Sequence, residues 1–137
     1  MDDPRLKESS SLLVKAALAR RDKEGVFIER GGRDSSYNAV SILMGTHLSL
    51  YSPSPELEAA FKPAMAWLKT RIKPTGEVEV EGNTRTGVGK ELSKSGVPKP
   101  VNYGEVSQTL WYYGALHDDT NAIALALKVE EYRRSKH

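Results

Sequence analysis

The stretch SPELEAAFKPAMAWLKTRI, residues 54–72, decides the fold class of this 137-residue chain. Ser54 can cap a helix, Pro55 suits the first helical position, and the turn that follows is acidic. Apolar side chains then recur at helical spacing, at Leu57, Phe61, Ala64, Leu68 and Ile72. Because the capping signals and the periodicity agree, the sequence predicts a helix over residues 55–72.

Four more segments have the same character. Apolar periodicity bounded by caps and breakers predicts helices over residues 5–20, 35–52, 103–117 and 121–134. Asn102 and Glu105 fit a capping box at the start of one of them. The sequence therefore predicts an all-α protein, a single domain over residues 1–137. We expect about five helices in antiparallel hairpins, with a long loop that carries short extended segments.

Composition excludes several classes of protein. The chain has no cysteine, which excludes disulfides, a thiolate nucleophile and cysteine-ligated zinc. No apolar run approaches the roughly 18–20 residues of a membrane span, so no membrane association is expected. The first residues lack the layout of a signal peptide, and the sequence does not indicate a cellular compartment. A net charge of +2 does not point to nucleic acid. No metal-ligand spacing is present, so neither a metal nor a cofactor is predicted.

The chain carries an internal repeat, with copies over about 22–52 and 73–117. Gly25 of GVFIER matches Gly76 of GEVEVE, 51 residues later, and the tyrosine that begins YNAVS has its match 66 residues later in YGEVS. Each copy reads as a glycine-led polar loop with a short extended piece, followed by a capped helix. Equivalent loops of adjacent hairpins are neighbours, so we expect the extended pieces of the two loops to pack together.

The first copy reads Gly-x-Phe-x-x-Arg-Gly-Gly-x-Asp-Ser-Ser-Tyr over residues 25–37, followed by an amphipathic helix. This layout resembles the repeat unit of the α/α-toroid enzymes, which include six-hairpin glycosidases, polysaccharide lyases and terpenoid-cyclase-like domains. The resemblance covers about residues 22–117, and a full toroid needs many more helices than this chain offers. It implies a partial toroid, a remnant of one or half of an assembly. Such a protein would bind carbohydrate or act on it, as a lyase or hydrolase of an acidic polysaccharide.

The two polar loops supply the candidate site, because both are expected to emerge at the same end of their hairpins. The candidate catalytic residues are Tyr37, which would abstract a proton in lyase chemistry, and Asp34, one of the carboxylates available for hydrolysis. The candidate substrate-binding residues are Arg33, Asn38, Asn83 and Arg85. Arginine pairs bidentately with a uronate carboxylate, and amides both donate to and accept from sugar hydroxyls.

A purely structural role explains the same residues. Asp34 is also a plain N-cap, Tyr37 can pack at the start of its helix, and the two arginines can pair with acidic side chains across the loops. The alternative to a carbohydrate-active protein is therefore a non-catalytic helical domain for binding or assembly. The two hypotheses differ in whether the arginines are free and face one cleft.

The predicted helix over residues 103–117 bears on assembly. It carries more apolar and aromatic side chains than one buried face uses, at Leu110, Trp111, Tyr112, Tyr113 and Leu116. Exposed apolar patches beyond roughly a few hundred Å² are uncommon on monomers. We therefore expect a homodimer, with a twofold axis as the default arrangement, unless the first and fifth helices flank this one and bury it within one chain.

Overall fold

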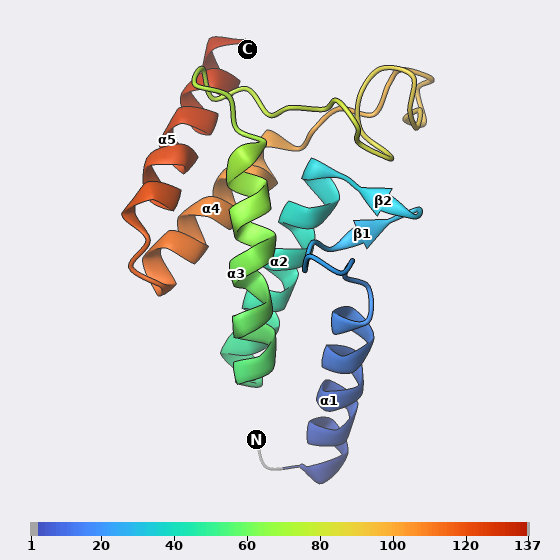
Figure 1. The fold of residues 1–137 in the computed structure, drawn as a ribbon, viewed down its shortest axis with the longest axis vertical. Coiled ribbons are helices and arrows are strands. Elements are labelled where there is room, and N and C mark those ends of the chain that lie inside the picture. The colour runs from blue at the N-terminus through green and yellow to red at the C-terminus, as the bar shows by residue number, and fades with distance from the viewer. Residues whose placement is uncertain (1–2, 137) are drawn as a thin grey trace.

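The computed structural model describes residues 3–136 and confirms an all-α fold, with five helices and one two-stranded sheet in the described range (Figure 1). The helices are α1 (Pro4–Leu18), α2 (Ser35–Tyr51), α3 (Pro55–Thr70), α4 (Tyr103–Leu116) and α5 (Thr120–Ser135). The sheet pairs β1 (Ile28–Glu29) with β2 (Gly32–Arg33) in antiparallel fashion. Each helix lies within two residues of its predicted bounds. None of the described helices is long and apolar enough to cross a membrane.

A polar side chain caps the first turn of every described helix. The caps, which accept from a backbone N–H two or three residues later, are Asp3, Asp34, Ser54, Asn102 and Asp119. Such caps satisfy N–H groups that the helix itself leaves without a partner. They are local in sequence, and for this reason the helix starts could be predicted closely.

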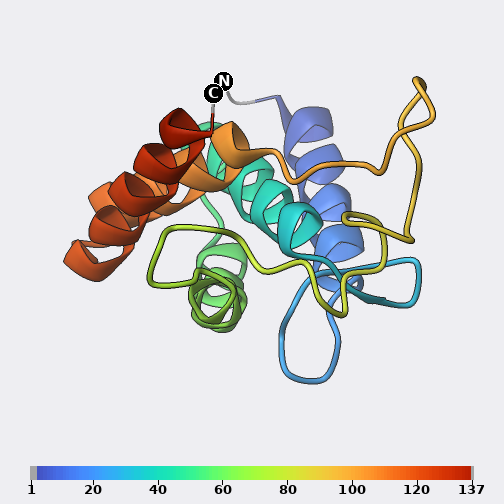
Figure 2. The ribbon, with the colours of Figure 1, turned by 90° about the horizontal axis from the view of Figure 1, so that it is seen from above.

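The helices pack as two layers that meet in one core. α2 and α4 lie side by side, α3 packs on α2, and α5 packs on α4 (Figures 1 and 2). The core between them is built on fully buried side chains such as Ile42, Phe61 and Leu110. α1 stands apart at one edge, where Val14 is its one buried residue. The N-termini of α2 and α4 lie at the same end of the molecule, under the two long polar loops.

The apolar face of α4 is only half covered. Leu110 and Tyr113 are buried, whereas Trp111, Tyr112 and Leu116 remain about half exposed. The helices that flank α4 are α2 and α5, so the alternative to a dimer, in which α1 and α5 bury α4 within one chain, is wrong. The chain thus leaves part of this face open, and the homodimer remains a prediction.

Three turns in the loops share one geometry: turn 1 (residues 21–27), turn 2 (residues 72–78) and turn 3 (residues 92–98). In each turn, the first and seventh residues form an isolated antiparallel bridge, and the N–H of the second residue donates to the carbonyl of the sixth. The fifth residue is a glycine with φ between +81° and +90°, a conformation that strains an L side chain. Turns 1 and 2 are the copies predicted from Gly25 and Gly76. Turn 3 lies inside the second loop and was not predicted.

Candidate functional site

The two polar loops are joined at Asp34, the cap of α2, whose side chain is 0% exposed. One carboxylate oxygen accepts from the N–H of Tyr37 at 3.0 Å. The other accepts from the N–H groups of Arg85 and Thr86, both at 2.8 Å, and the Thr86 hydroxyl donates to the same carboxylate. Asp34 therefore does more than cap α2, because it fastens the second loop to the start of that helix.

Two of the predicted substrate-binding residues lie in the protein interior. The side-chain oxygen Oδ1 of Asn83 accepts from the N–H of Ser35 at 2.9 Å, and the side-chain nitrogen Nδ2 donates to the Thr86 hydroxyl at 2.7 Å. Asn38 accepts from the N–H of Phe27 at 3.1 Å and donates to the carbonyl of Ala64 at 3.0 Å. The chain thus satisfies both amides itself, and neither side chain faces the cleft described below.

The sequence predicted that the extended pieces after Gly25 and Gly76 would pack together, but the hydrogen bonds between the two loops lie further along each loop. Each short extended piece bridges back to its own loop, between Arg21 and Phe27 and between Ile72 and Val78. The hydrogen bonds between the loops instead involve residues 29–35 and 79–86. For example, Thr84 donates from its N–H to the Arg33 carbonyl and from its hydroxyl to the Glu29 carbonyl.

The two predicted arginines are paired within the chain. Arg33 binds Asp22 at 2.7 Å and Glu24 at 2.6 Å, both in its own loop. Arg85 binds Glu91 at 2.6 Å and lies 3.6 Å from Glu29 of the other loop. Both guanidinium groups thus have carboxylate partners, and Arg33 does not line the cleft.

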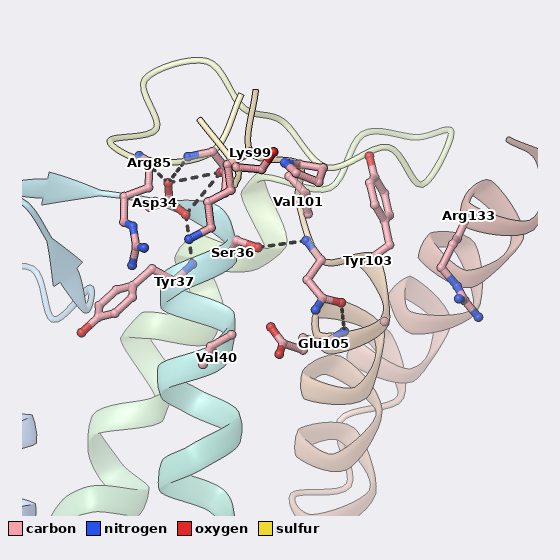
Figure 3. A pocket seen from close by; sticks show the side chains of 15 residues that line it. Asp34, Ser36, Tyr37, Val40, Arg85, Lys99, Val101, Tyr103, Glu105 and Arg133 are labelled. Carbon is pink, nitrogen blue, oxygen red and sulfur yellow. Dashed lines mark hydrogen bonds between the residues drawn. The ribbon is translucent and has the colours of Figure 1, made fainter. Parts of the chain in front are cut away.

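A cleft of about 940 Å³ opens between the N-terminal ends of α2 and α4 (Figure 3). Residues from both loops and from three helices line it, among them Tyr37, Val40, Arg85, Lys99, Glu105 and Arg133. Of the six predicted site residues, the cleft brings together Asp34, Tyr37 and Arg85. The other three lie outside it.

Tyr37 and Tyr103, which the repeat places in matched positions, have different roles. The Tyr103 hydroxyl accepts from the N–H of Val78 at 3.1 Å, its ring stacks on Tyr132, and burial raises the pKa of Tyr103. The half-buried Tyr37 has no hydrogen bond from its hydroxyl to any residue between 3 and 136. Tyr37 is thus the tyrosine of this pair that can offer a free hydroxyl to a ligand.

The capping box predicted for α4 is only half formed, and this frees Glu105. The Asn102 side chain accepts from the N–H of Glu105 at 3.1 Å, as expected. The N–H of Asn102, however, donates to the Ser36 hydroxyl at 3.1 Å instead of to the Glu105 carboxylate. Within the described part of the chain the Glu105 carboxylate makes no hydrogen bond, and it lines the cleft. Sequence reasoning missed this residue because Ser36 is remote along the chain.

The pairing of Arg85 with Glu91 gives a prediction about charge. The hydrogen bond from Arg85 lowers the pKa of Glu91 below its ordinary value of 4.5. In Arg85→Gln the pKa of Glu91 should therefore rise. A lowered pKa in the folded state favours folding above the ordinary pKa, and this contribution is lost as pH falls through the lowered value, so the variant should lose less stability in acid.

NMR titration of the side-chain carboxyl carbons measures this shift. Glu130 is the internal control, because its pKa is lowered by its own partner, Arg133, and should not change. An unchanged pKa of Glu91 in Arg85→Gln would contradict the pairing.

Comparison with known proteins finds no matching family model, no matching curated protein and no matching solved structure. Between residues 3 and 136, no cluster of three or more His, Cys, Asp or Glu side chains is arranged to hold a metal ion.

Proposed function

We propose that the cleft between α2 and α4 binds an uncharged stretch of a polysaccharide without cleaving it. The observation that carries this proposal is that two side chains with free hydrogen-bonding atoms, Tyr37 and Glu105, line one cleft, where Figure 3 shows them on opposite sides of the N-terminal end of α2. Sugar hydroxyls both donate and accept, so they suit a carboxylate that accepts and a phenol that does both. The Tyr37 ring and Val40 add apolar surface against a sugar ring face. The resemblance of layout to α/α-toroid enzymes supports the same class of ligand.

The charges around the cleft favour an uncharged ligand over an acidic one. Arg85 is held by Glu91 and Glu29, and Arg133 is held by Glu130 at 2.6 Å. A uronate carboxylate would have to displace these partners before it could bind a guanidinium fork, and it would approach the free carboxylate of Glu105. A neutral sugar meets neither obstacle.

The hydrogen bonds of Asp34 favour binding over hydrolysis. A glycosidase of the common type needs two carboxylates that flank the scissile bond. Asp34 is buried and already accepts from three backbone N–H groups and one hydroxyl. Among the residues that line the cleft, this leaves Glu105 as the one carboxylate with free oxygens, and a single carboxylate does not make that pair.

A polysaccharide lyase is the second candidate, and the free hydroxyl of Tyr37 is the observation that favours it. A lyase neutralises a uronate carboxylate and abstracts the adjacent proton. Lys99, whose ammonium is 3.9 Å from Glu91, is the cation of the cleft with the loosest pairing. Under this hypothesis Tyr37→Phe would abolish cleavage of polyuronates and keep their binding.

Replacement of Tyr37 tests the proposed function. Tyr37→Ala should weaken binding of a neutral oligosaccharide by about tenfold, equivalent to roughly 1.4 kcal/mol, because it removes both the ring and the hydroxyl. Calorimetric titration with neutral gluco-, xylo- and manno-oligosaccharides, and with oligouronates as the acidic comparison, measures this loss.

Tyr51→Ala is the matched control, since Tyr51 is 89% exposed at the far end of the same helix. Its affinity should equal that of the unmodified protein. Equal affinities for all three proteins, or binding of oligouronates alone, would overturn the proposal.

A further inference from the structure

We propose that the chain forms a twofold dimer in which turn 3 of each copy docks on α1 of the other. The proposal starts from the two turns that are already docked within one chain. A side-chain carbon added to Gly25 of turn 1 would lie 2.7 Å from Pro63 of α3, and one added to Gly76 of turn 2 would collide with the Lys128 carbonyl of α5. Both turns therefore pack their glycine directly against a helix.

The two docking positions are equivalent. Pro63 is the ninth residue of α3, and Lys128 is the ninth residue of α5. Turn 1 follows α1 and docks on α3, and turn 2 follows α3 and docks on α5. The molecule thus uses one contact twice: a glycine turn on the middle of the next odd-numbered helix.

Turn 3 has the features of a docked turn but packs on no helix of residues 3–136. Its sequence SKSGV shares lysine, glycine and valine with DKEGV of turn 1, at the same places. A side-chain carbon on Gly96 would meet no atom of the described residues within 4 Å. Val97 is 54% exposed, whereas Val26, at the same place in turn 1, is 2% exposed. Turn 3 is therefore the free half of a contact that the chain makes twice elsewhere.

α1 is the free other half. It is the odd-numbered helix on which no turn of the described chain docks, and like α3 it begins with a proline after a capping residue. Its ninth residue, Leu12, is 60% exposed, and Leu6 and Leu13 are exposed with it. The position that receives a turn on α3 and α5 is thus an open apolar surface on α1.

The arrangement of the two free halves identifies the occupant as a second copy. Turn 3 projects on a long arm, and both this arm and α1 lie on the side of the molecule away from α5 (Figures 1 and 2). They stand at opposite ends of the long axis in Figure 1. A twofold axis between them would place each turn 3 on the partner's α1, so that both contacts form at once. Exposed Leu92 and Val97 would then cover the leucines of α1, which removes apolar surface from water.

Engineered thiols test this contact, because the chain has no cysteine of its own. Leu12→Cys and Ser95→Cys, made as separate single variants and mixed under mild oxidation, should form a disulfide-linked heterodimer. The yield should exceed by about tenfold that of Leu127→Cys mixed with Ser95→Cys, since Leu127 is similarly exposed on α5. Similar yields from the two mixtures, or Leu12→Cys that links mainly to itself, would overturn the proposal.

Sedimentation equilibrium gives a second readout that does not depend on thiols. The unmodified protein should approach twice the 15.1 kDa of one chain as concentration rises. Leu12→Asp and Val97→Asp should each remain at the mass of one chain, and Trp111→Asp, on the open face of α4, should still dimerise. A monomer at every concentration, or a dimer that only Trp111→Asp disrupts, would contradict docking of turn 3 on α1.

Discussion

Asp34→Ala should lower the free energy of unfolding by about 4 kcal/mol, several times the loss expected for an ordinary helix cap. The substitution leaves the buried N–H group of Thr86 and the partly buried N–H groups of Tyr37 and Arg85 without their acceptor. Each buried donor left unsatisfied costs roughly 1–3 kcal/mol, whereas loss of a solvent-exposed cap costs about 1 kcal/mol. The second loop should also become more mobile, because Asp34 is its anchor on α2.

Asn102→Ala is the matched control for this prediction. Asn102 caps α4 through one backbone N–H, that of Glu105, and its side chain lies at the surface. Its loss should be about 1 kcal/mol. Urea denaturation followed by circular dichroism compares the two variants, with the slope of the transition checked for equality. Equal losses would show that Asp34 is a cap and nothing more.

Gly76→Ala should have the second largest effect, about 3 kcal/mol. The glycine has φ of +90°, which costs an L residue roughly 1–2 kcal/mol. The added carbon would also collide with the Lys128 carbonyl, and because that atom belongs to the backbone of α5, a helix would have to shift. Turn 2 and α5 should therefore separate, and the melting temperature should fall.

Gly96→Ala isolates the contribution of the close approach. Gly96 has nearly the same φ, +81°, but no atom in the described part of the chain lies within 4 Å of the added carbon. Its cost should be the backbone term alone, roughly 1–2 kcal/mol. Both variants are best measured in the Leu12→Asp background, where docking of turn 3 plays no part. Equal melting temperatures for the two alanine variants would contradict the packing of turn 2 on α5.

Local signals made the helices predictable. Ser54 and Pro55 start α3, and Asp34 starts α2, through contacts within three residues along the chain. Such short-range patterns depend little on the rest of the fold, so the sequence alone places the ends of these helices well. The same reasoning recognised Asp34 as a cap.

The remaining part of the site depends on contacts between distant segments. The second carboxylate oxygen of Asp34 accepts hydrogen bonds from Arg85 and Thr86, about fifty residues away, and no local sequence pattern predicts these contacts. Ser36 takes the N–H that a capping box would assign to Glu105, which leaves that carboxylate in the cleft. The structural alternative considered from the sequence was that both arginines form ion pairs across the loops. Arg85 does so with Glu29, whereas Arg33 forms its ion pairs within its own loop.

The most direct test of the proposed function is an NMR titration of the isotope-labelled protein with a neutral oligosaccharide. Saturable shifts should concentrate on the amides of Tyr37, Val40, Glu105 and their neighbours along the cleft, and in Tyr37→Ala they should need about tenfold more ligand to saturate. They should be absent around Tyr51, at the other end of α2. If no saturable shifts occur at millimolar ligand, or if the shifts lie elsewhere on the molecule, the cleft is not a saccharide site.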